Sequence, residues 1–366
     1  MKILRTKYAM GKNYQLNSVI HVVSSLEVGG AERFVIDLCQ LQKKAGMSVA
    51  ILSFGQETDP LVAECNAFNI DVFHTREGRI KKWRDAINAL SSFDIVHFHT
   101  PYPVKFLLPF LPMLASKTLI YTRHGASPLA GLGWSVTHKV ANFFIDHITF
   151  VSQEGAEIFT ASHGWHKKTK HVIDNGVNLD QVQVSRKPTT FLRLGSVGRM
   201  VELKHQICLL RAIAMLAPEI REQVKVEFFG DGPCKSELTA FCQDEALDDL
   251  VTFHGMVSDR DVIYNSFDVL VVASETEGLS LAIMEAMAYE CAVIATDVGG
   301  NSKLVQDQQN GYLFRYDDHE TLASHIKSLI ESPDRINEFA SKSRGLIEEQ
   351  FSLAVSSDKY QKIYQS

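Results

Sequence analysis

The stretch DVLVVASETEGLSLAIMEAMA, residues 268–288, passes from one kind of secondary structure to another. Its first part, 268–274, is rich in valine, as is typical of a buried β-strand. A short loop through Gly278 leads into 281–288, where Glu285 is the only polar residue. Since a helix that is apolar all round is buried, the stretch indicates a strand–loop–helix unit of a parallel sheet.

The same alternation of strand-like and helix-like segments recurs along the whole chain. A polar segment with an Asn-Gly pair and a proline, 174–190, is the best candidate for a linker between two sets of such units. We therefore expect an α/β fold with two parallel sheets of similar size facing a central cleft, and an extra helix at 351–366. The expected strands are 19–25, 47–54, 70–74, 94–99, 118–124, 147–152 and 170–176, then 191–198, 224–230, 250–255, 268–274, 291–296 and 311–316.

Composition limits the classes of function. The chain has 366 residues, of which 45% are hydrophobic and 22% charged, as in ordinary soluble globular proteins. Its net charge of -6 gives no support to nucleic-acid binding. The six cysteines are scattered without a C-x-x-C pair, which suggests reduced thiols in the cytosol. Neither a signal peptide nor a bilayer-spanning run is evident, so we expect a cytoplasmic protein.

Ligands of open parallel sheets bind beyond the carboxyl ends of the strands, so residues that follow strands are the candidates for a site. Gly29 and Gly30 follow the first expected strand and open the next helix. Glycines there let a ligand approach the backbone, and the N-terminus of the helix favours an anion. The alternative is a plain strand–helix turn.

Three histidines lie at or near the ends of two expected strands. His97 and His99 alternate along 94–99, so their side chains point to the same face. No nearby residues complete a metal-ligand set with familiar spacing, so we expect no metal, one histidine packed inside and His99 lining the cleft. His124 ends the strand at 118–124, where its imidazole could bind a sugar hydroxyl or serve only in packing.

Two cations follow the first strand of the second half. Arg199 and Lys204 could hold a diphosphate, or they could belong to a solvated basic turn.

Two carboxylates belong to the opening stretch. Glu277 lies on the loop, and the backbone N–H groups of Gly278, Leu279 and Ser280 at the start of the helix could hold a phosphate. Glu285 lies one to two turns further on, where a buried carboxylate needs a core Arg or Lys or a polar ligand such as the two hydroxyls of a ribose. Because the preceding loop suits a phosphate, we favour the ligand.

Several motifs occur in a fixed order: VGGAERF, HFHTPY, YTRHG and VIDNGVN, followed by GRMVELKHQ, FFGDGP, SETEGLSLAIMEAMA, ATDVGG and NGYLF. In this order and spacing the chain resembles the retaining glycosyltransferases of family 4 over nearly its whole length, and the E-x7-E spacing is the most specific element. The resemblance implies a GT-B fold with two Rossmann-like domains. Residues 1–183 would bind the acceptor, with helix 351–366 crossing back to them, and residues 190–350 would bind a nucleotide sugar.

The resemblance also implies a role for each candidate residue. Arg199 and Lys204 would bind the diphosphate and neutralise the leaving group, while Glu277 would hold hydroxyls of the donor sugar and Glu285 those of the ribose. The remaining donor contacts would come from Gly29, Gly30, His124, Met256, Val257, Gly278, Leu279 and Ser280. His99 stays a candidate for the acceptor side of the cleft.

The implied chemistry is front-face transfer with retention, in which the leaving phosphate deprotonates the acceptor hydroxyl. No carboxylate pair is evident for double displacement. Arg and Lys supply the positive charge, so neither a metal nor another cofactor is required. UDP or GDP is the favoured nucleotide of the donor.

The implied role is the synthesis of a bacterial surface polysaccharide (lipopolysaccharide, capsule or exopolysaccharide) on a glycan or lipid-linked acceptor. Two alternatives stay open: a non-catalytic paralogue that binds sugar nucleotides, and a sugar-nucleotide epimerase, which would lack the E-x7-E spacing. One departure bears on donor preference, because Lys303 stands in GGNSKLV where many relatives have an acidic residue.

Two segments of the first half could contact a membrane. Residues 78–90 are basic and include a tryptophan, and residues 103–114 are apolar but interrupted by prolines. Together they suggest peripheral docking at the inner face of the cell membrane, where a lipid-linked acceptor would lie. The alternative is an ordinary solvated face.

Overall fold

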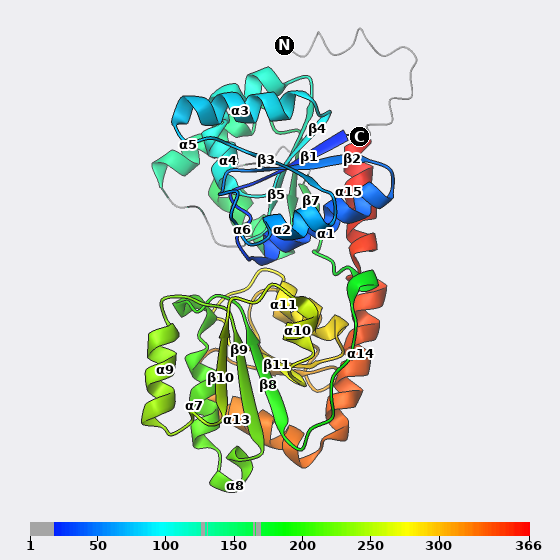
Figure 1. The fold of residues 1–366 in the computed structure, drawn as a ribbon. Helices are drawn as coiled ribbons and strands as arrows, with labels where there is room; N and C mark the ends of the chain where they lie inside the picture. Colours follow the sequence, from blue (N-terminus) through cyan, green and yellow to red (C-terminus); the bar gives the residue numbers. More distant parts are fainter. Residues whose placement is uncertain (1–17, 126–128, 130, 164, 166–169) are drawn as a thin grey trace.

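The computed structural model describes residues 18–125, 129, 131–163, 165 and 170–366, which form two parallel sheets, one above the other in Figure 1. The first sheet has seven strands in the order β3-β2-β1-β4-β5-β6-β7. Its strands are β1 (Ser18–Val23), β2 (Ser48–Ser53), β3 (Asp71–His74), β4 (Ile95–Phe98), β5 (Thr118–Arg123), β6 (His147–Phe150) and β7 (Lys170–Val172).

The second sheet has six strands in the order β10-β9-β8-β11-β12-β13, which repeats the order of the first sheet up to its sixth strand. Each expected strand overlaps one of the strands observed, so the two-sheet α/β prediction is confirmed. The strands are β8 (Leu192–Val197), β9 (Val224–Phe229), β10 (Val251–Gly255), β11 (Val269–Val272), β12 (Ala292–Thr296) and β13 (Tyr312–Phe314).

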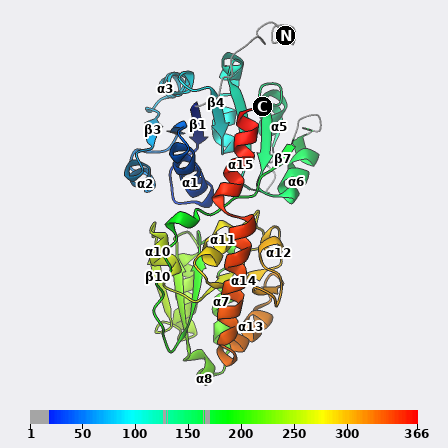
Figure 2. The ribbon, with the colours of Figure 1, turned by 90° about the vertical axis from the view of Figure 1, so that its right-hand side faces the viewer.

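Helices lie on both sides of each sheet (Figures 1 and 2). Those of the first half are α1 (Gly30–Lys44), α2 (Val62–Ala67), α3 (Arg79–Ser91), α4 (Pro101–Phe106), α5 (Leu132–Ala141) and α6 (Gln153–His163), with 3-10 turns η2 (Leu108–Leu114) and η3 (Leu179–Gln181). Those of the second half are η4 (Glu202–Lys204), α7 (Ile207–Met215), α8 (Pro218–Arg221), α9 (Lys235–Asp244), α10 (Arg260–Tyr264), α11 (Leu281–Ala288), α12 (Asn301–Leu304), α13 (His319–Glu331) and α14 (Asp334–Gln350), followed by α15 (Leu353–Tyr364).

Alternation along the strands explains this layering. On β1, Val19 packs in the apolar cluster on one face of the sheet, and Ile20 packs in the cluster on the other face. Both faces are therefore buried, as in other sheets whose strands are all parallel. In the second half, α11 lies inside its cluster, which explains why its sequence is apolar all round.

Two crossings of the chain connect the halves. The first passes through Val177 and the second leads from α14 into α15, which runs up along the first half and packs against α1 (Figure 2). The crossings are hydrogen bonded to each other, since Val177 N donates to Phe351 O at 2.9 Å and Leu353 N donates to Val177 O at 2.8 Å. The predicted linker 174–190 forms no strand of either sheet.

Among the described residues, no helix combines the length and apolar character needed to cross a bilayer.

The six cysteines are free thiols, all buried except Cys234, which is half-buried.

Candidate functional site

A cleft of about 860 Å³ lies between the two sheets, at the carboxyl ends of their strands. Its lining comes from the loops after β1, β5 and β8 to β11. These loops surround the points where the strand order reverses in each sheet, which is where ligands of such folds bind. Twelve of the candidate residues, from both halves, line the cleft: Gly29, Gly30, His124, Arg199, Lys204, Met256, Val257, Glu277, Gly278, Leu279, Ser280 and Glu285.

The loop that carries Arg199 is held by close backbone packing. A Cβ on Gly230 would lie 2.0 Å from the carbonyl oxygen of Gly198, and both residues have positive φ angles. Glycine is therefore required where the loops after β8 and β9 meet. Met200 N donates to Asp231 O at 2.9 Å across the same contact. The motifs GRMV and FFGDG thus fix the position of Arg199 at the edge of the cleft.

Lys204 and Glu277 form an ion pair in the cleft. Lys204 Nζ lies 2.5 Å from Glu277 Oε1, which also accepts a hydrogen bond from Ser274 Oγ at 2.8 Å. The backbone supports this pair, because Glu275 N donates to Leu203 O at 2.9 Å. The cation and the carboxylate that the sequence predicted for one site therefore meet, and both remain partly exposed to a ligand.

The turn before α11 is supported from behind by Gly299 and Gly300. A Cβ on Gly299, whose φ is 52°, would lie 1.9 Å from the carbonyl oxygen of Glu277. Gly300 N donates to Gly278 O at 2.7 Å. The helix itself begins at Leu281, so the three residues that we expected to open it form the turn and N-cap instead. Their position at the helix N-terminus still suits an anion.

Glu285 is buried in a network that joins the two halves. Its Oε2 accepts a hydrogen bond from Tyr264 Oη at 2.6 Å, and its Oε1 lies 3.1 Å from Arg260 Nε. Arg260 Nη1 in turn lies 2.8 Å from Asp37 Oδ2 on α1. The core ion pair that we weighed as the alternative for Glu285 therefore exists, although the carboxylate also lines the cleft.

His124 lines the cleft from the first half, whereas His99 does not. His99 is 2% exposed and lies behind His124, with its Nδ1 3.0 Å from His124 Nε2. The expectation that His99 lines the cleft is therefore wrong, because the turn after β4 directs its ring into the core. The rings of His97 and His99 are 4.0 Å apart, which confirms that they point to the same face.

Comparisons with known proteins agree with this geometry. Residues 28–181 match the family described as Glycosyltransferase Family 4, and residues 192–332 match the one described as Glycosyl transferases group 1. Together the two matches span most of both halves. The chain belongs to the family 4, group 1 glycosyltransferases.

Individual relatives of this glycosyltransferase are distant but extend over most of its length. EpsD of Bacillus subtilis, which carries a provisional glycosyltransferase name, is 24% identical over 328 residues, covering 82% of this chain and 85% of that protein. An alpha-1,4-N-acetyl-D-galactosaminyltransferase of Campylobacter jejuni is 23% identical over 319 residues, covering 84% and 88%. Anabaena Alr3699/HepE, solved with UDP and glucose, matches with a TM-score of 0.81 at 20% identity, covering 95% and 99%. Its likeness shows that this glycosyltransferase has the GT-B fold.

Several cleft residues of the glycosyltransferase were missed from the sequence. Arg260 and Tyr264 line the cleft from α10, Arg33 and Glu32 from α1, and Asn175 from the first crossing. Burial raises the pKa of Glu32, and the positive charge of Arg199 partly offsets this effect. Arg260 could have been predicted from the sequence, because it follows Asp259, a typical N-cap residue, at the start of the first helix after β10.

Lys303, the departure from the pattern of many relatives, does not line the cleft of the glycosyltransferase. Its Nζ lies 2.6 Å from Asp174 Oδ1, at the start of the first crossing. The lysine thus connects α12 of the second half to the C-terminal end of the first half.

Proposed function

We propose that this glycosyltransferase moves a sugar from a nucleotide diphosphate sugar to a hydroxyl of a glycan or lipid-linked acceptor, with retention of configuration. The observation that carries the proposal is the cleft itself. It places Arg199 and Lys204 of the second half opposite Gly30 and His124 of the first. A donor bound there would have its diphosphate next to the two cations of the second half. Its sugar would face the first half, which we expect to bind the acceptor.

The diphosphate would lie between the cations and the turn before α11. Arg199 and Lys204 supply positive charge, and the backbone N–H groups at Leu279 and Ser280 add donors at a helix N-terminus. Charge develops on the leaving diphosphate during the reaction, so fixed cations lower the barrier. Lys204, held by Glu277, needs little reorganisation to meet that charge.

The nucleoside would occupy the end of the cleft beyond the turn. Glu285 would accept hydrogen bonds from the two ribose hydroxyls, while Arg260 and Tyr264 hold the carboxylate in its orientation. The backbone of Met256 and Val257 would meet the base. Glu277 would hold hydroxyls of the sugar through the oxygen that is not occupied by Lys204 and Ser274.

In the proposed step, the bond between the anomeric carbon and the diphosphate oxygen breaks as the bond to the acceptor oxygen forms on the same face. The proton of the acceptor hydroxyl passes to the leaving phosphate. Double displacement is disfavoured because Glu277 is tied to Lys204 and Glu285 lies at the nucleoside end. Because two side-chain cations already serve the diphosphate, we propose that the reaction needs no metal and no further cofactor.

The relatives support the donor and acceptor classes. Alr3699/HepE has been solved with UDP-glucose, which favours a UDP-sugar here, with a GDP-sugar as the next candidate. The Campylobacter enzyme is named for a saccharide linked to PP-undecaprenol. We therefore propose a role in bacterial surface polysaccharide synthesis. A non-catalytic paralogue or an epimerase would not need the cations, Glu277 and Glu285 together in one cleft.

We further propose peripheral docking of the first half on a membrane, with α5 added to the two segments expected. In the segment 103–114, Leu107 and Leu111 are buried in the core, and Trp83 of the segment 78–90 packs against Phe106. Ile80 and Met113 of these segments are nevertheless exposed, at 79% and 66%. Further exposed apolar side chains lie on α5, at Leu132, Val136 and Val140, and just after it at Phe143, with Lys105 and Lys139 beside them. We propose a cytoplasmic protein that docks on an anionic bilayer through this face.

The test is binding and turnover with a panel of UDP-, GDP- and ADP-sugars. We expect one nucleotide sugar to raise the melting temperature, as a ligand of the folded state does, and to be slowly hydrolysed. Glu285→Ala should lose that shift, whereas Glu237→Ala on α9, away from the cleft, should keep it. The anomeric configuration of a transferred sugar, measured by NMR, tests retention. If no nucleotide or nucleotide sugar binds, the proposal is wrong; binding without turnover would favour the non-catalytic paralogue.

A further inference from the structure

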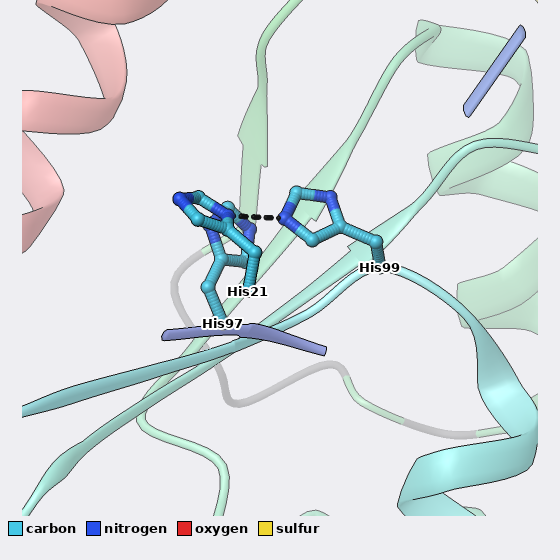
Figure 3. Close-up of side chains that lie close together, drawn as sticks. All are labelled: His21, His97 and His99. Carbon is cyan, nitrogen blue, oxygen red and sulfur yellow. Dashed lines mark hydrogen bonds between the residues drawn. The ribbon is translucent and has the colours of Figure 1, made fainter. Parts of the chain in front are cut away.

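A chain of buried hydrogen bonds runs from α1 through three histidines to the cleft. Gln42 Oε1 lies 2.8 Å from His21 Nε2, and His21 Nδ1 lies 2.8 Å from His99 Nε2 (Figure 3). His99 Nδ1 then lies 3.0 Å from Nε2 of His124, which lines the cleft. The chain of hydrogen bonds thus connects a residue near the C-terminal end of α1 with the site proposed for the sugar.

Each link of this chain depends on the position of a proton. A neutral imidazole has one nitrogen that donates and one that accepts. The carbonyl oxygen of Gln42 only accepts, so His21 donates from Nε2 and accepts at Nδ1. His99 must then donate from Nε2 and accept at Nδ1, and His124 must donate from Nε2. One amide at the inner end therefore assigns the tautomer of every ring along the chain.

A second contact holds the Gln42 amide in this orientation. Its Nε2 donates to Tyr364 Oη at 3.2 Å, and Tyr364 Oη lies 2.9 Å from His97 Nδ1. His97 completes the set by its Nε2, 2.6 Å from Thr122 Oγ1. Tyr364 belongs to α15, so the helix that crosses back to the first half also helps to fix the direction of the hydrogen bonds.

The rings are kept neutral by burial. Desolvation lowers the pKa of His21 and of His124 to about 4, and it lowers the pKa of His97 and His99 well below the usual value. His21, His97 and His99 lie close enough together to be considered as metal ligands. However, both ring nitrogens of each are already engaged in the hydrogen bonds above, so the arrangement fits a proton-ordered network.

At the cleft end, His124 Nδ1 and Asn175 Oδ1 form no well-aligned hydrogen bond with the described residues, although the two side chains lie near enough to each other to interact. Both side chains line the cleft, and Asn175, which is 3% exposed, lies beside His124. If the proton of His124 is on Nε2, its Nδ1 and Asn175 Oδ1 both offer lone pairs to the same part of the cleft. A buried acceptor without a partner is costly, and a ligand with hydroxyl groups would satisfy both.

We propose that Gln42, His21 and His99 are positioning residues that hold His124 with its proton on Nε2, so that His124 Nδ1 and Asn175 Oδ1 accept hydrogen bonds from hydroxyls of the transferred sugar. The inference rests on the proposed function, because it needs a sugar donor in the cleft. It adds Asn175 as a binding residue and a row of buried residues that act only through His124.

The first test is NMR of protein labelled with 15N-histidine. The imidazole spectra should place the proton of His21, His99 and His124 on Nε2, with couplings across the hydrogen bonds that join the three rings. Gln42→Leu should give His124 a mixture of tautomers, whereas Gln42→Glu, which keeps an acceptor toward His21, should restore the wild-type pattern. Gln40→Leu is the matched control, since it removes a buried glutamine of the same helix outside the chain.

The second test compares a nucleotide sugar from the panel with its bare nucleotide. Gln42→Leu and Asn175→Leu should each weaken binding of the nucleotide sugar about tenfold, as expected for one or two lost hydrogen bonds, and leave binding of the bare nucleotide unchanged. A proton on His124 Nδ1 in the wild type, or equal weakening of both ligands, would overturn the inference. Failure of every nucleotide and nucleotide sugar to bind would overturn the proposed function, while the imidazole spectra would still test the tautomer.

Discussion

The structure suggests that Lys204 contributes to catalysis and not only to binding of the donor. Its Nζ lies 2.5 Å from Glu277 Oε1, and the lysine side chain is 31% exposed. The glutamate therefore positions the ammonium without removing it from the cleft. Charge on a departing diphosphate rises in the transition state, so the ammonium should stabilise that state more than the bound donor.

We expect Lys204→Gln to lower kcat of sugar transfer or donor hydrolysis about 100-fold, with a much smaller change in KM, because a fixed charge next to the leaving group is lost. Steady-state kinetics with the donor found in the panel would measure this. Lys327→Gln provides the control, since Lys327 lies on the same half but pairs with Glu331 at the surface, away from the cleft. A variant within threefold of wild-type kcat would show that Lys204 does not serve the leaving group.

At this scale the sequence predicts which residues face the cleft better than how they are paired. Residues that follow strands, such as Arg199 and Glu277, reach the cleft because parallel strands all end at one edge. The partners of Glu285 lie on α10, and those of His99 lie on β1 and after β5. Such contacts depend on side-chain directions and on packing between distant segments, which periodicity along the chain does not specify.

Among the elements, the strands are predicted well and one exposed helix is not. Runs of valine, isoleucine, leucine and alanine mark β11 and β12 because these strands are buried on both faces. On α5, apolar residues at 132, 136 and 140 follow helical spacing, as they would on a helix packed in a core. In the structure Leu132 is 83% exposed and Phe143 after the helix 82% exposed. Sequence periodicity shows that a helix has an apolar face but not what covers it.

This α5 face gives a test of membrane docking. We expect the wild type to co-sediment with phosphatidylcholine vesicles that contain phosphatidylglycerol. Leu132→Ser/Phe143→Ser should reduce the bound fraction several-fold, because two exposed apolar side chains no longer enter the interface. The matched control is Phe191→Ser/Met215→Ser, which changes two exposed apolar residues of the second half. Equal sedimentation of the wild type and the α5 variant would contradict docking through α5.

In the whole molecule, charged contacts hold the two halves in this arrangement. Arg260 Nη1 meets Asp37 of the first half at 2.8 Å, and Arg33 Nη2 donates to the carbonyl oxygen of Ser258 at 2.7 Å. The Arg260 and Asp37 side chains are 11% and 5% exposed. Because Arg260 also contacts Glu285, the donor site and the contact between the halves share one guanidinium.

Removing Arg260 should therefore loosen the molecule as well as the site. Arg260→Met would leave Asp37 and Glu285 buried without a cation, so we expect a loss of about 3 kcal/mol in stability of the closed arrangement. Small-angle scattering should show a larger radius of gyration, and thermal unfolding a lower midpoint. Asp37→Asn/Arg260→Met should recover part of the loss, since one unpaired carboxylate is removed. Unchanged scattering and melting in Arg260→Met would show that the guanidinium does not hold the halves together.

The two crossings at Val177 and Ser352 run parallel and are hydrogen bonded, and a Cβ on Gly176 would lie 2.6 Å from the carbonyl oxygen of Ser352. Two backbones held this closely together act as a single connection between the halves, and such a connection can serve as a hinge. We expect relative motion of the halves to bend these crossings and so to widen or narrow the cleft, which His124 lines from the first half and Lys204 from the second.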